Sequence, residues 1–159
     1  MIKQFLESVA WGDLDYLVID TPPGTSDEHI AVVELLQQHR KPMQAVLVTT
    51  PQLIAVQDVE KEVTFCERVG VPVAGVIENM SGYVCPHCST CTNVFSSGGG
   101  EWLATTRNLP FLGRVPISAR IARLFNGTSA GGDDVVAEYE RSDAYPLFTE
   151  ILGKIGKQP

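Results

Sequence analysis

The sequence is poor in the features that mark nucleic-acid-binding, membrane-spanning and fibrous proteins. Its 12 lysine and arginine residues stand against 19 acidic ones, a net charge of −7 with no basic cluster, which argues against broad electrostatic attraction to nucleic acid or an anionic membrane. The longest apolar runs have the length of a strand, so none spans a bilayer. Low-complexity tracts and internal repeats are absent. We therefore expect one globular domain over residues 1–159 with a buried core.

Cysteine is also scarce, and its distribution excludes a disulfide framework. Three of the four cysteines, Cys85, Cys88 and Cys91, lie within seven residues, whereas Cys66 is far off in the sequence. Crowded thiols of this kind suggest metal or redox chemistry in a reducing compartment. The first twelve residues read as a short amphipathic helix and not as a secretory signal. Both observations favour a cytoplasmic location.

Apolar, β-branched runs predict strands at residues 16–19, 45–48, 73–77 and 111–115. Their continuous apolar character suits strands that are buried on both faces of a parallel sheet. Helix-like segments separate the runs. This alternation predicts an α/β fold with an open, mostly parallel sheet and helices on both faces.

Three segments predict helices around these strands. Residues 25–28 resemble a capping box that begins a helix ending near His39, and residues 147–155 predict a closing helix with Pro146 near its first turn. Residues 52–69 predict the third helix, with an apolar stripe at helical spacing formed by Leu53, Val56, Val59, Val63 and Cys66. A cysteine on such a stripe usually behaves as a small buried hydrophobe. The polar, glycine-rich residues 127–143 predict a surface loop.

Open sheets of this type bind ligands beyond the carboxyl ends of their strands. Asp20 follows the first apolar run, where a Walker-B carboxylate would hold Mg²⁺, although a plain turn after a strand explains it equally well. The next residues contain two stiff prolines, Pro22 and Pro23, and the flexible Gly24, which suits a loop that switches between two positions.

The phosphate-binding motif of nucleotide hydrolases is missing. No G-x-x-x-x-G-K-[ST] stretch occurs in the chain, so by itself it is expected not to hydrolyse ATP. The glycines at 98–100 either present the amides of a helix N-terminus to an anion or simply make a tight start to a helix.

Four stretches together resemble one known family. They are LDYLVIDTPPGTSDEH (14–29), ENMSG (78–82), CPHC (85–88) and FSSGGGE (95–101). In this order they are similar to the Mrp/Nbp group of deviant-Walker P-loop ATPases, relatives of MinD and the nitrogenase iron protein, and within it to the cytosolic iron–sulfur cluster assembly scaffolds of the Cfd type. The resemblance covers nearly the whole chain and implies a MinD-like P-loop NTPase fold.

The resemblance also implies a nucleotide site for ATP and Mg²⁺ in the intact protein. It assigns cofactor-binding roles to Asp20, Pro22, Pro23, Gly24, Asn79 and Pro116. The first is the Walker-B aspartate, the next three form a switch loop, and the last two contact adenine. Family members carry a long segment before this region, which includes the phosphate loop and the central strand. We therefore expect the chain to be the C-terminal part of such a domain, with a sheet that lacks its central strand or borrows one.

The remaining implied site is the cysteine pair. Cys85 and Cys88 match the C-P-x-C pair that binds a 4Fe–4S cluster, and two chains that meet at a two-fold axis would supply the four thiolates that a cubane needs. Cys91 is then a spare thiol. The implied function is a cytosolic scaffold that passes a labile cluster to acceptor apoproteins, as a homodimer or with a longer paralogue. A zinc-stapled interaction module and a thiol–disulfide exchange site remain alternatives.

Overall fold

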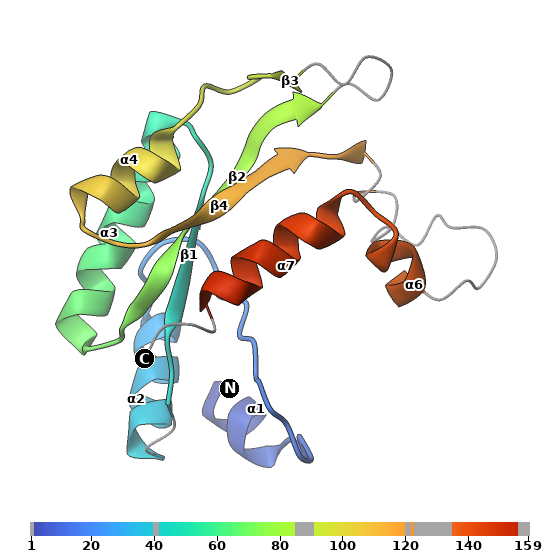
Figure 1. Ribbon diagram of the computed structural model, residues 1–159. Coiled ribbons are helices and arrows are strands. Elements are labelled where there is room, and N and C mark those ends of the chain that lie inside the picture. Colours follow the sequence, from blue (N-terminus) through green and yellow to red (C-terminus); the bar gives the residue numbers. More distant parts are fainter. Residues whose placement is uncertain (1, 40–41, 85–90, 120–121, 123–134, 156–159) are drawn as a thin grey trace.

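The computed structural model describes residues 2–39, 42–84, 91–119, 122 and 135–155 (Figure 1). Its sheet is centred on β2 (Val73–Val84), which pairs in parallel with β1 (Ala45–Thr49) on one side and with β4 (Phe111–Ile117) on the other. The short β3 (Cys91–Thr92) pairs antiparallel with the end of β2. Three of the four predicted strands are therefore confirmed, and β2 is longer than predicted.

Helices cover both faces of the sheet, as predicted. On one face α3 (Leu53–Val69) and α4 (Gly99–Thr106) pack against β1 and β2, around a core that contains Val63, Val76 and Leu103. On the other face lies α7 (Ala144–Ile155) (Figure 1), whose buried residues join those of β4 in a second core cluster. Within the described residues, no helix has the length and apolar character needed to cross a membrane.

Helix α3 shows how directly the sequence sets this architecture. Its apolar positions recur at helical spacing, and four of the five stripe residues are buried: Val56, Val59, Val63 and Cys66. Leu53 is the exception, because it is the first residue of the helix and remains 67% exposed. The helix ends at Gly70, whose left-handed conformation (φ 70°) suits the C-cap position.

The other helices differ from the sequence prediction mainly in their bounds. Helix α1 (Ile2–Ser8) confirms the expected N-terminal helix. Helix α2 (Asp27–Gln38) begins one residue later than predicted, because its N-cap is Ser26 and not Thr25. The backbone N–H of Ser26 donates a hydrogen bond to Nδ1 of His29 at 3.2 Å. Helix α6 (Val135–Glu140) occupies part of the region 127–143, so the prediction of a continuous loop there was wrong.

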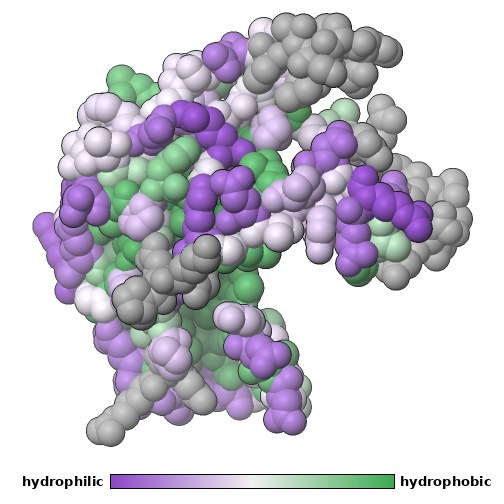
Figure 2. Space-filling model, in the orientation of Figure 1, coloured by the Kyte–Doolittle hydropathy of each residue, from purple (hydrophilic) through white to green (hydrophobic). Residues whose placement is uncertain are grey.

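The predicted strand at residues 16–19 is absent from the sheet, and this prediction was wrong. The segment is a coil in which Tyr16 is 85% and Val18 is 89% exposed. Apolar residues form a strand only where a neighbouring strand pairs with the backbone, and no described strand pairs with this segment. Figure 2 shows hydrophobic surface in the gap between α7 and α1. Exposed residues of the coil and of β1 include Leu17, Val18, Val46 and Val48.

The backbone of β2 approaches the start of β4 so closely at Gly75 that only glycine fits. A Cβ there would lie 2.6 Å from the carbonyl oxygen of Pro110 and 2.7 Å from Cγ of Leu112, and the φ of 151° disfavours any side chain. We predict that Gly75→Ala lowers the free energy of unfolding by about 1–3 kcal/mol, measured by urea denaturation. Gly153→Ala in α7 is the matched control, because its Cβ meets no atom within 4 Å; an equal effect of both variants would contradict the packing argument.

Candidate functional site at the carboxyl edge of the sheet

The three parallel strands end at one edge of the sheet, and two of the predicted site residues lie there. Register pairs Thr49 of β1 with Glu78 of β2, and Asn79 of β2 with Val115 of β4. Pro116 follows Val115 in β4. Asn79 and Pro116 are thus brought onto neighbouring strands at the same edge, as expected for two residues of one binding site.

The Asn79 side chain is held by its own backbone. Its Oδ1 accepts a hydrogen bond from the backbone N–H of Met80 at 2.9 Å. Met80 has a positive φ of 55°, which is uncommon for a residue other than glycine. The strand therefore changes direction directly after Asn79, and the bond fixes the amide group at this bend.

The residues of the predicted switch loop lie apart from this pair. Asp20, Pro22 and Pro23 are exposed in the coil that leads to α2. The backbone N–H of Gly24 donates to Oε1 of Glu62 at 3.0 Å, which ties the loop to α3. Among the described residues no hydrogen bond or ion pair joins this loop to Asn79, and a common site for the six predicted residues stays a prediction.

The predicted metal ligands, Cys85 and Cys88, lie outside the described residues. The strand ends on either side of them are described: Tyr83 pairs with Thr92, and Val84 with Cys91. In sequence the CPHC motif therefore falls between two paired strand ends, and these ends of β2 and β3 lie at the end of the molecule opposite α1 (Figure 1). Groups of three or more possible metal ligands are absent from the described part of the chain.

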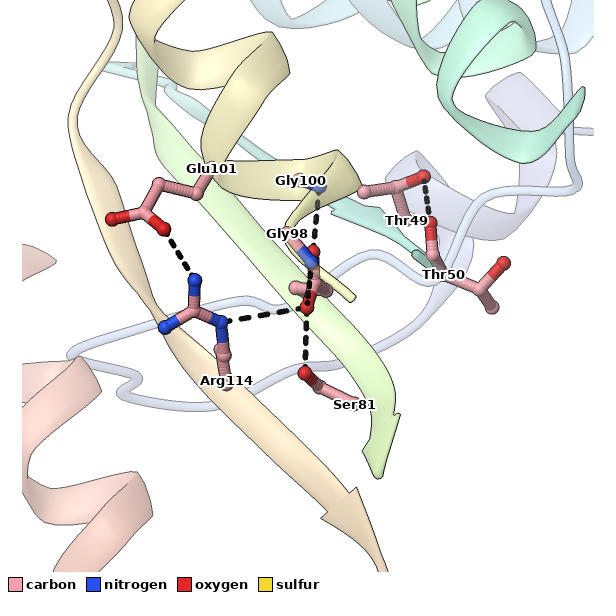
Figure 3. Close-up of polar contacts among 8 residues, drawn as sticks. Thr49, Thr50, Ser81, Gly98, Gly100, Glu101 and Arg114 are labelled. Atoms are coloured by element: carbon pink, nitrogen blue, oxygen red, sulfur yellow. Dashed lines mark hydrogen bonds and ion pairs between the residues drawn. The ribbon is translucent and has the colours of Figure 1, made fainter. Parts of the chain in front are cut away.

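The buried carboxylate of Glu78 lies at the same edge. This residue belongs to the ENMSG motif, but the sequence alone assigned it no role. The Glu78 side chain is fully buried and accepts hydrogen bonds from Oγ of Ser81 (2.6 Å) and from backbone N–H groups of Gly98 (3.3 Å) and Gly100 (2.7 Å). Nε of Arg114 lies 3.5 Å from its Oε1, and the same guanidinium pairs with Glu101 (Figure 3). Every contact places a donor against the carboxylate, which is how a buried charge is made tolerable.

The glycines at 98–100 fulfil both roles considered for them. Gly98 is the N-cap of α4 with a φ of 81°, so a tight start to the helix is confirmed. The anion that meets the helix N-terminus is the Glu78 carboxylate. A Cβ on Gly100 would lie 2.9 Å from Cβ of Glu78, so only glycine lets the helix approach the carboxylate this closely.

These contacts set the pKa of Glu78. Burial on its own raises the pKa, but the hydrogen bonds from Ser81, Gly100 and Gly98 and the positive charge of Arg114 together lower the pKa below its ordinary value of 4.5. The carboxylate is therefore ionised at neutral pH although it is buried.

Cys66 is a free, buried thiol, as the apolar stripe predicted. Burial, and next the negative charge of Glu62, raise the pKa of this thiol above 9.0. It is a packing residue of α3 with little thiolate character.

Comparison with known proteins places this geometry in a family. The family model described as ParA: NUBPL iron-transfer P-loop NTPase matches residues 1–156. The cytosolic Fe-S cluster assembly factor NUBP2 of Rattus norvegicus is 54% identical over 155 residues, covering 98% of this chain and 55% of the relative. The cytosolic Fe-S cluster assembly factor CFD1 of Saccharomyces cerevisiae is 51% identical over 158 residues, with 99% and 54% covered. The chain thus spans about half the length of the curated relatives it matches.

Solved structures agree on the fold. A nucleotide-binding protein of Archaeoglobus fulgidus in complex with ADP matches with a TM-score of 0.60 at 32% identity, over 99% of this chain and 54% of that one. The cell division ATPase MinD of Pyrococcus furiosus matches with a TM-score of 0.64 at 18% identity, over 98% and 57% of the two chains. The predicted MinD-like P-loop NTPase fold is therefore confirmed.

The lowered pKa of Glu78 predicts that stability depends on pH in the acid range. A carboxylate whose folded pKa lies below its unfolded pKa contributes stability that is fully present above the unfolded pKa, near 4.5, and is lost as the pH falls through the folded pKa. Urea denaturation at a series of pH values should show the free energy of unfolding falling below pH 4.5 more steeply in the wild type than in Glu78→Gln. Glu150→Gln, which removes an exposed carboxylate on α7, should keep the wild-type dependence. Identical acid profiles for Glu78→Gln and the wild type would refute the assignment.

Proposed function

Since this chain belongs to the ParA/NUBPL family of iron-transfer P-loop NTPases, we propose that it forms the cluster-carrying part of a cytosolic iron–sulfur cluster assembly scaffold. The observation that carries the proposal is the position of the CPHC motif. In sequence the motif falls between two paired strand ends, in a chain about half of whose residues are identical to those of two cytosolic Fe-S cluster assembly factors.

The cargo is a 4Fe–4S cluster held by Cys85 and Cys88 of each of two chains. A cubane requires four thiolates, and this motif supplies two. Cys66 is a poor substitute ligand because it is buried in the core with a raised pKa. A second chain, identical or a longer paralogue, completes the set. Ligands carried on a connection outside the two core clusters suit a cluster that must be released to acceptor apoproteins.

In the full-length protein the same edge of the sheet takes part in binding ATP and Mg²⁺. The residues present fit a nucleotide at one point, because Asn79 and Pro116 lie together on neighbouring strands and the Asn79 amide is fixed by its backbone bond. These two residues would contact the adenine. Asp20 would hold Mg²⁺, which neutralises phosphate charge when bound, and Pro22, Pro23 and Gly24 would form the loop that responds to it. The bond from Gly24 to Glu62 gives that loop a defined resting position on α3.

The cysteine assignment is tested by anaerobic reconstitution with iron and sulfide. We expect about two iron atoms per chain with a broad visible charge-transfer band, loss of both and of cluster-dependent dimerisation in Cys85→Ala, and retention of most of the iron in the matched variant Cys91→Ala. Full iron content in Cys85→Ala would remove the assignment. Stoichiometric zinc that survives reduction, without the visible band, would support the zinc-stapled module instead.

The adenine contact is tested by nucleotide binding to the full-length protein. Asn79→Ala should weaken ATP binding by roughly tenfold and reduce the preference for ATP over GTP, because a hydrogen-bonding side chain that reads the base is lost. Gln57→Ala, an exposed change on α3, is the control and should bind both nucleotides as the wild type does. Unchanged selectivity in Asn79→Ala would exclude the contact.

A further inference from the structure

Glu78 is the only fully buried ionisable side chain among the described residues, and it touches both ends of the segment that carries the cysteines. Ser81, which donates at 2.6 Å, lies in β2 three residues before the strand ends at Val84. Gly98 and Gly100, which donate at 3.3 and 2.7 Å, lie where the chain returns and α4 begins. The carboxylate therefore closes a loop between Ser81, three residues after it, and Gly98 and Gly100, which lie 20 and 22 residues after it.

The other described contacts of this segment include a short strand pairing and the packing of Gly99 against Pro51 and Val56. The pairing of β2 with β3 comprises only two residue pairs, Tyr83 with Thr92 and Val84 with Cys91, and an isolated pairing of this length is marginal in water. Closing a loop of this length costs conformational entropy, which charge-assisted hydrogen bonds to a buried carboxylate can offset. The position of the segment therefore depends on Glu78.

We propose that Glu78 is a positioning residue for the iron–sulfur cluster, which fixes the points where the cysteine-bearing segment leaves and rejoins the sheet. This inference rests on the proposed function, since the cluster is the cargo of that segment. Glu78 is not one of the proposed cluster ligands. It acts through its hydrogen bonds with Ser81 on one side and with the N-terminal amides of α4 on the other.

The chemistry of the contacts makes Glu78→Gln the informative change. A glutamine side chain has almost the same shape, but its NH₂ group can only donate. Since both carboxylate oxygens of Glu78 face donors, Oε2 toward Gly100 and Oε1 toward Ser81, Gly98 and Arg114, the amide would oppose a donor in either orientation. The segment would lose one of its two attachments while the side chain still fills its space.

The test measures cluster release in the full-length protein reconstituted anaerobically. We expect Glu78→Gln to lose its visible charge-transfer band to an excess of chelator about tenfold faster than the wild type, a rate ratio that corresponds to the loss of one hydrogen bond to a charged group. Ser81→Ala, which removes one donor from a partly exposed position, should shift release in the same direction by less. Amide hydrogen exchange should also become faster at Gly98 and Gly100 in Glu78→Gln.

Two controls separate positioning from general stability. Val63→Ala creates a cavity in the α3 core and leaves all donors to Glu78 in place. It should destabilise the fold without faster release at a temperature where all variants are folded. Glu67→Gln removes an ion-paired carboxylate elsewhere on α3 and should also release the cluster at the wild-type rate. Equal release by Val63→Ala and Glu78→Gln, or wild-type release in both Glu78→Gln and Ser81→Ala, would overturn the proposal.

The exchange measurement separates the two levels of the argument. If the wild type binds no cluster, the proposed function fails, and faster exchange in Glu78→Gln would still show that Glu78 holds the segment. If the wild type binds the cluster and exchange at Gly98 and Gly100 is unchanged in Glu78→Gln, the positioning role is overturned and the proposed function stands.

Discussion

The charge on Glu78 is the constraint around which the carboxyl edge of this protein is built. A carboxylate removed from water costs several kcal/mol unless donors replace the lost hydration. Here the donors come from β2, from the start of α4 and from β4. Glu78 therefore ties these elements together at this edge, and Gly100 is required because a Cβ there would lie 2.9 Å from Cβ of Glu78 and push the helix away from it.

The residues with candidate binding roles lie near the carboxyl ends of the strands, whereas the residues that pack the core lie on the two faces of the sheet. The two core clusters, one on each face, consist of apolar residues from β1, β2, β4 and three helices. Toward the carboxyl ends of the strands the sequence becomes polar, with Asn79 and Ser81 in the last part of β2 and the cysteine motif after it. Under the proposed function, this separation would let the cysteine-bearing segment respond to its partners without disturbing the cores.

Local sequence patterns correctly predicted one long helix and three strands. Helix α3 and strands β1, β2 and β4 were found because their apolar residues recur at the period of the element or form continuous buried runs. Residues 16–19 have the same strand-like composition, yet they form a coil, because strand pairing depends on a neighbour that composition does not reveal.

The candidate site also contains residues that could be predicted from the sequence and one that could not. Asn79 and Pro116 were predicted from a family resemblance, and the register brings them to one edge. The importance of Glu78 could not be predicted, since two of its partners are backbone amides 20 and 22 residues away that carry no side-chain signal. A glutamate that directly follows a continuous apolar strand is the one hint the sequence offers. Cys85 and Cys88 lie outside the described residues, so their role stays a prediction.

The burial of Cys66 and the raised pKa of its thiol limit its reactivity. A thiol that stays protonated reacts slowly with electrophiles, peroxide and disulfides. Under the proposed function, it would therefore not compete for metal during cluster loading, and it would not form mixed disulfides when an oxidant strips the cluster. Oxidation and repair would leave Cys66 and the core around it unchanged through repeated cycles of loading and delivery.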